Sequence, residues 1–134
     1  MARIMICDDD KAMVERLAEA LVVAGHEAET CRHTMDMLRG AADGRFDLIA
    51  FALDMAGFGR TGAVEALNEV APQVPLIALY DRPSQIVRAA AQARFAALLP
   101  RPVAVKDFMY AVACALNGYA PTQRQTRNAP ASLA

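Results

Sequence analysis

The stretch Leu48-Ile49-Ala50-Phe51-Ala52-Leu53 decides the fold of this chain. It is almost continuously apolar, which is typical of a central strand buried on both faces of a parallel sheet. Further apolar runs occur on either side of it, at Arg3 to Cys7 and at Pro75 to Tyr80. Because segments with helical periodicity separate these runs, the sequence predicts stacked βαβ units in one α/β domain.

Two more strands and five helices complete the predicted domain. The strand Glu27 to Cys31 has little apolar content and is predicted at a sheet edge, and a brief strand covers Ala97 to Leu99. An alanine-rich helix runs from Pro83 to about Arg94. Apolar residues three or four apart predict the buried faces of the other helices. These are Val14, Leu17, Leu21 and Val22; Met35, Leu38 and Ala42; Val64, Leu67 and Val70; and Phe108, Val112 and either Ala115 or Leu116 in a helix that begins at Asp107 and ends near Gly118. We expect the domain to span residues 1–118, with a disordered tail over residues 119–134.

Composition argues against several classes of partner. The 14 basic and 15 acidic side chains give a net charge of −1, which offers no electrostatic footprint for nucleic acid or an anionic membrane. No segment is apolar enough to span a bilayer. Cys7, Cys31 and Cys114 lack the spacing of a metal site, so we interpret them as packing residues of a cytoplasmic protein in a reducing compartment.

The first strand ends in the acidic run Asp8-Asp9-Asp10. Carboxylates this close repel one another unless a cation or a helix N-terminus compensates them. Asp10 is placed to cap the following helix, and the helix dipole alone explains an acidic run there. A metal site at the carboxyl ends of the strands explains it equally well, and both interpretations stay open.

Several segments together resemble the receiver domain of bacterial response regulators. Ile4 to Asp10 is similar to the strand and acidic pair that open that family, and Phe46 to Gly57 is similar to its third strand and following loop. Pro75 to Leu79 resembles the fourth strand, and Leu99 to Pro102 resembles the segment that contains the family's Lys-Pro pair. The resemblance implies a flavodoxin-like, doubly wound (βα)5 fold with a five-stranded parallel sheet in the order 2-1-3-4-5.

In receivers an aspartate accepts a phosphoryl group, and this sequence departs from the family at that site. The resemblance places Ala52 at the acceptor position, Tyr80 at the position of a hydroxyl, Leu98 at that of a switch aromatic and Arg101 at that of the lysine. Metal and cation must be pre-positioned for a carboxylate to attack a phosphoryl donor. The sequence therefore predicts an atypical pseudo-receiver, without enzymatic activity, that does not undergo standard aspartyl phosphorylation.

Asp54 is the alternative acceptor. It lies two residues beyond Ala52, and two residues of strand displace a carboxylate by roughly 6 to 7 Å, too far for in-line transfer at the family's site. By resemblance Asp8, Asp9 and Asp54 are the candidate metal ligands. They would hold Mg²⁺ weakly, so no resident cofactor is expected.

Arg101 suggests a replacement for the metal, because its guanidinium would reach Asp8 or Asp9 and form a bidentate ion pair. An exposed Arg101 without contacts is the other interpretation. Tyr80 would either fill the room left by Ala52 or hold a neighbouring loop.

Two other features of the sequence are each associated with a different class of function, and neither class is favoured here. Gly57, Gly59 and Gly62 spell a GxGxxG motif, but it follows the third strand instead of the first, which argues against a nucleotide-binding domain. Neither His26 nor His33 follows the carboxyl end of a strand, so a histidine-based enzyme is not favoured.

The sequence thus favours a stand-alone signalling module of a two-component system or phosphorelay. By resemblance its partner is a histidine kinase, a phosphotransfer protein or another regulator, and it is a monomer or weak homodimer. The expected partner surface runs over Ser84 to Arg94 and Val105 to Tyr119. Its exposed members are predicted to be Gln85, Arg88, Gln92, Lys106 and Tyr110.

Overall fold

The structure, a computed structural model, describes residues 1–53, 63–82 and 95–118. Its strands are β1 (Arg3–Cys7), β2 (Glu27–Cys31), β3 (Leu48–Ala52), β4 (Leu76–Tyr80) and β5 (Ala97–Pro100). The helices of the described ranges are α1 (Lys11–Val23), α2 (Thr34–Ala42), α3 (Ala63–Val70) and α5 (Val105–Leu116). The helix predicted from Pro83 to Arg94 and the tail predicted from residue 119 lie outside the described residues.

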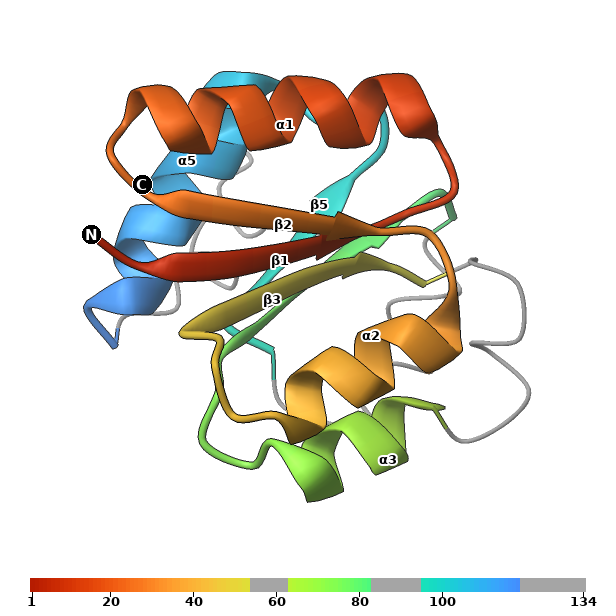
Figure 1. Cartoon of the computed structure of the whole chain (residues 1–134). Coiled ribbons are helices and arrows are strands. Elements are labelled where there is room, and N and C mark those ends of the chain that lie inside the picture. The colour runs from red at the N-terminus through yellow and green to blue at the C-terminus, as the bar shows by residue number, and fades with distance from the viewer. Residues whose placement is uncertain (54–62, 83–94, 119–134) are drawn as a thin grey trace, which may run out of the picture.

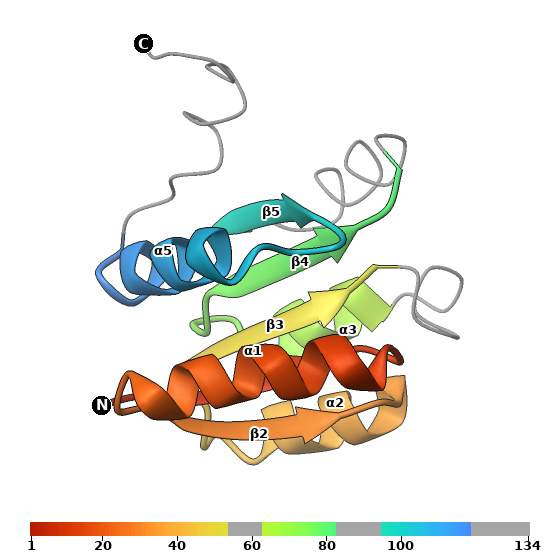
Figure 2. The same ribbon diagram turned by 90° about the horizontal axis from the view of Figure 1, so that it is seen from above.

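The five strands form one parallel sheet in the order β2-β1-β3-β4-β5, which confirms the predicted flavodoxin-like fold. The helices α1 and α5 cover one face of this sheet and α2 and α3 cover the other (Figure 1). The view from above shows the same layers (Figure 2). Every residue of β3 is buried, as expected for a central strand between two helical layers, whereas the edge strand β2 has no fully buried residue.

Two apolar cores lie on the two faces of the sheet. One lies beneath α1 and α5 and includes Ile4, Leu17 and Phe108. The other lies beneath α2 and α3 and includes Phe51 and Leu67. The strands β1, β3 and β4 have buried residues in both cores, and the carboxyl ends of all five parallel strands lie at one edge of the sheet.

Some residues predicted on the buried faces of the helices are exposed in the structure. Val22, Met35 and Val70 were expected in the core, but they are 59%, 62% and 45% exposed, and Ala42 is exposed as well. The residues that are buried instead are Met13 in α1, Met37 and Ala41 in α2, and Ala71 just after α3. A helical period fits more than one set of apolar positions in a short helix, and the face that meets the sheet selects among them.

Local signals define the ends of the helices. Asp10 accepts a hydrogen bond from the backbone N–H of Met13 at 3.2 Å and so caps α1 as predicted. Gly25 follows α1 with a φ of +95°, a conformation that favours glycine. The last helix begins at Val105, two residues before the predicted start at Asp107, which lies in its first turn. None of the helices in the described ranges has the length and apolar character needed to cross a membrane.

Candidate functional site

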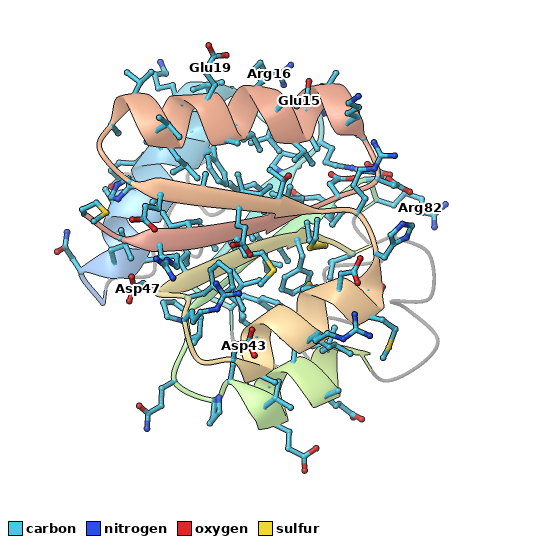
Figure 3. The ribbon with its side chains drawn as sticks, in the orientation of Figure 1. Glu15, Arg16, Glu19, Asp43, Asp47 and Arg82 are labelled. Atoms are coloured by element: carbon cyan, nitrogen blue, oxygen red, sulfur yellow. A yellow bond between two sulfur atoms is a disulfide. The ribbon has the colours of Figure 1, made fainter. Side chains whose placement is uncertain are left out.

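Three charged side chains meet where three strands of the sheet end. Asp8 follows β1, Asp81 follows β4 and Arg101 follows β5. The carboxyl ends of parallel strands lie at the same edge of the sheet, and ligands of open α/β sheets bind along that edge. Figure 3 shows Arg82 at this edge, whereas Asp47 lies at the opposite edge and accepts a hydrogen bond from the backbone N–H of Arg3 at 2.8 Å.

The Arg101 guanidinium joins the two carboxylates. Its Nη1 donates to both oxygens of Asp8, at 2.7 and 2.9 Å. Its Nε and Nη2 donate to the two oxygens of Asp81, at 2.8 and 2.7 Å. The predicted contact with the acidic run is therefore present at Asp8, but the planar, bidentate pair is made with Asp81. We refer to Asp8, Asp81 and Arg101 as the charged triad.

Burial sets the electrostatics of the triad. The Asp8 side chain is completely buried, while those of Arg101 and Asp81 are 15% and 38% exposed. Burial raises the pKa of the Asp8 carboxyl, and the hydrogen bond and positive charge of Arg101 oppose that rise. The backbone N–H of Asp10 also donates to Asp8, at 3.1 Å. Arg101 therefore compensates a carboxylate that would otherwise be costly to bury.

The described residues do not fit a divalent cation at this position. Both oxygens of Asp8 already accept hydrogen bonds from Arg101. In the parts of the chain that the structure describes, no group of three His, Cys, Asp or Glu side chains is arranged to hold a metal ion. Asp9 is exposed beside Asp8, and Asp54 lies outside the described residues. A cation at Asp8 would have to displace the guanidinium, so we assign no step to a metal.

Ala52, the position predicted for the phosphoryl acceptor, is completely buried. It ends β3 and belongs to the core beneath α2 and α3. Tyr80 and Leu98 are partly buried and pack against the same core. Tyr80 therefore packs against the core that contains Ala52, and both interpretations of its role stay predictions. The methyl group of Ala52 offers no reactive atom at this edge.

Cys7 and Cys31 were interpreted as packing residues, and the structure corrects this interpretation. They are register partners at the ends of β1 and β2, with Cα atoms 4.7 Å apart, and a disulfide joins them. Cys114 is free and partly exposed. The pairing was missed because 24 residues separate the two cysteines in sequence, and only the parallel alignment of the two strands brings them together.

Asp81 is the triad member that the sequence analysis did not assign to this site. Its position just after an apolar strand was the available signal, since such residues reach the carboxyl edge of a parallel sheet. Nδ1 of His26 accepts a hydrogen bond from the backbone N–H of Ala2, before β2 begins. The prediction for His33 requires correction, because this exposed residue lies two positions after the carboxyl end of β2.

The predicted partner surface is described only in part. Lys106 and Tyr110 are exposed on α5, as expected. Four further groups of predicted residues lie outside the described ranges, and the structure says nothing of them: the glycine motif Gly57, Gly59 and Gly62, the alternative acceptor Asp54, the helix positions Gln85, Arg88 and Gln92, and the tail.

Taken together, the strand order and the charged triad at the carboxyl edge define a doubly wound α/β domain of the flavodoxin-like class. No protein-family model matches the chain. One curated protein, the DNA-binding transcriptional regulator NtrC of Azospirillum brasilense, is 30% identical over 122 residues, which are 90% of this chain and 25% of that protein. The chain therefore spans about a quarter of the length of this relative.

Solved structures give the same class. A response regulator CheY-like protein from Mesorhizobium loti is 26% identical and matches with a TM-score of 0.70 over 84% of this chain and 96% of that one. A Burkholderia pseudomallei response regulator, solved with a phosphorylated aspartic acid, a calcium ion and citrate, is 17% identical with a TM-score of 0.74 over 88% of this chain and 70% of that one. Other receiver-domain structures give TM-scores from 0.75 to 0.79 over 87 to 88% of this chain. The chain is thus similar in fold and in sequence to CheY-like receiver domains of response regulators.

Proposed function

We propose that this receiver domain signals by binding a partner protein and does not undergo aspartyl phosphorylation. The observation that carries the proposal is the pair of contacts from Arg101 to both oxygens of Asp8. In a phosphorylatable receiver this carboxylate would serve a metal that neutralises the phosphoryl group. Here the guanidinium of Arg101, which is part of the chain, is permanently paired with the Asp8 carboxylate, so the site is structural.

The acceptor position supports the same conclusion. Phosphoryl transfer to an aspartate needs a carboxylate aligned with the donor and a cation that stabilises the charge of the transition state. Ala52 supplies no carboxylate, and its side chain is fully buried. The acceptor carboxylate is therefore missing, and Arg101 occupies the carboxylate of Asp8 that would bind a metal cation. Restoring one of these two features alone is insufficient.

Binding is the function that remains for a receiver without a phosphorylation switch. We propose a histidine kinase, a phosphotransfer protein or another regulator as the partner, bound through a surface that includes Lys106 and Tyr110 of α5. Both residues are exposed, Tyr110 to 49%. Aromatic side chains are common anchors of protein interfaces. The affinity would be the same with and without a phosphodonor.

The decisive experiment is intact-mass spectrometry after incubation with Mg²⁺ and acetyl phosphate. We expect the wild-type protein and the Asp54→Ala variant to keep their unmodified masses. A phosphoryl group on the wild type that Asp54→Ala abolishes would show a working switch with a displaced acceptor, and the proposal would be wrong.

Variants designed to gain phosphorylation test the acceptor position and Arg101 separately. We expect Ala52→Asp alone to remain unmodified because Arg101 still occupies Asp8, and we expect Ala52→Asp combined with Arg101→Lys to gain a phosphoryl group. Ala52→Asn with Arg101→Lys is the matched control, since it has the same size without a nucleophilic carboxylate. Circular dichroism confirms that each variant is folded. Phosphorylation of the Ala52→Asp variant alone would show that Arg101 does not block the site.

The binding surface is tested separately with purified phosphotransfer domains of candidate histidine kinases on a biosensor. For the domain that binds, we expect Lys106→Glu with Tyr110→Ala to weaken binding by about tenfold or more. Glu19→Ala, on the outward face of α1 in Figure 3, is the control and is expected to leave binding unchanged. Equal affinity for all three proteins would exclude this surface of α5.

A further inference from the structure

We propose that Cys31 is a site of thiol–disulfide exchange, and that its reversible bond to Cys7 controls how firmly the end of β2 is held beside the charged triad. This inference rests on the placement of the two cysteines and does not depend on the proposed function. The disulfide lies at the carboxyl edge of the sheet, where Cys7 directly precedes the buried Asp8.

Backbone contacts connect the disulfide with the triad. The backbone N–H of Asp8 donates to the carbonyl oxygen of Cys31 at 3.1 Å. Asp8 is therefore held by Arg101 through its side chain and by Cys31 through its backbone. A change in the position of Cys31 would act on the backbone of the residue that anchors the triad.

The strand that carries Cys31 is the less strongly held partner. β2 is the outermost strand next to β1, and it contains no fully buried residue. An edge strand pairs on one side only, and β2 has little apolar surface to bury. Three residues after Cys31 the chain enters α2 at Thr34. The disulfide is thus the covalent contact that ties this segment to the interior of the sheet.

The exposure of the two cysteine residues indicates which of them the incoming thiol attacks. Cys7 is completely buried, whereas Cys31 is partly exposed. A thiolate of a small thiol such as glutathione attacks the sulfur of Cys31, the bond to Cys7 breaks, and Cys7 leaves as a thiolate that takes up a proton. A second thiol displaces the first from Cys31, which releases the small disulfide and leaves two protein thiols. Oxidation by the small disulfide is the reverse of these steps.

The test combines thiol alkylation with hydrogen exchange on the full chain in glutathione buffers of different redox ratio. In oxidising buffer we expect iodoacetamide to modify Cys114 but neither Cys7 nor Cys31. In reducing buffer we expect Cys31 to become modified and the amides of residues 28–34, together with that of Asp8, to exchange about tenfold faster or more.

Two variants keep the proposal falsifiable. Cys114→Ser, which lies outside the disulfide, is expected to respond to the redox buffer as the wild type does. Cys31→Ser is expected to exchange rapidly in both buffers, and Cys31→Ala repeats this measurement without a hydroxyl group. Alkylation of Cys31 that is equal in both buffers, or exchange of residues 28–34 that is unchanged on reduction of the disulfide, would overturn the proposal.

Discussion

Nη1 of Arg101 lies 2.7 Å from one carboxylate oxygen of Asp8 and 2.9 Å from the other. The two residues are 93 positions apart in the chain, and they meet because β1 and β5 end at the same edge of one parallel sheet. A carboxylate buried this deeply requires a compensating cation, and in this chain the cation is the Arg101 side chain. The first three predictions below follow from this contact.

Removing Arg101 is expected to destabilise the domain strongly. Arg101→Met leaves Asp8 buried without its cation, and breaking a buried ion pair in this way costs about 3 to 5 kcal/mol. Chemical denaturation at pH 7 measures the loss in free energy of unfolding.

The matched control is Arg39→Met, which removes an exposed ion pair with Asp36 and is expected to cost less than about 1 kcal/mol. Adding Asp8→Asn to Arg101→Met is expected to recover part of the lost stability, because the unpaired charge is then gone. Equal effects of Arg101→Met and Arg39→Met would show that the buried contact with Asp8 contributes nothing.

Stability is expected to depend on pH through Asp8. Burial raises the pKa of this carboxyl above its ordinary value of 3.8, with the hydrogen bond from Arg101 opposing the rise. A carboxyl whose pKa is higher in the folded state takes up a proton on folding, so its contribution is complete below the unfolded pKa and is lost as the pH rises through the folded pKa. We expect this loss above about pH 4 in the wild type and its absence in Asp8→Asn.

Urea denaturation at a series of pH values compares the two proteins. In addition, carboxyl NMR titration of Arg101→Gln should show a still higher pKa for Asp8, because the opposing cation is removed. An Asp8 pKa that is the same in Arg101→Gln and wild type would contradict the role given to the guanidinium.

Magnesium binding is expected to improve when Arg101 is removed. Arg101→Ser frees both oxygens of Asp8 and takes away a positive charge, so we expect its affinity for Mg²⁺ to exceed that of the wild type by about tenfold or more. Isothermal titration calorimetry measures both affinities, with Arg39→Ser as control for the change in net charge. The same affinity in Arg101→Ser and wild type would show that Arg101 does not compete with the metal.

The N-terminal cap of α1 is expected to make an independent contribution. Asp10→Ala removes the acceptor for the backbone N–H of Met13 and should cost about 1 kcal/mol. Lys11→Ala, an exposed neighbour inside the helix, is the control and should change stability by less than about 0.5 kcal/mol. The two variants differ clearly in thermal unfolding if the cap acts as described, and an Asp10→Ala protein as stable as Lys11→Ala would refute it.

Much of the site could be predicted because its members sit next to strong local signals. Asp8 and Arg101 follow apolar strands, and a parallel sheet brings such residues to one edge. Asp81 follows β4 in the same way, but nothing in the sequence indicates that the Nε and Nη2 edge of the Arg101 guanidinium would pair with it in preference to Asp9. That choice depends on angles between side chains from β4 and β5, which only the assembled sheet defines.

The sequence by itself determined the fold, because the continuous apolar run of β3 and the alternation of strand and helix periods are local properties that admit few packings. It also determined the absence of a carboxylate at Ala52. Only the tertiary structure decided which helix faces are buried, that Cys7 and Cys31 are joined, and that Arg101 neutralises Asp8. These features depend on contacts between residues far apart in the chain, and such contacts are defined by the register of neighbouring strands, which no local pattern specifies.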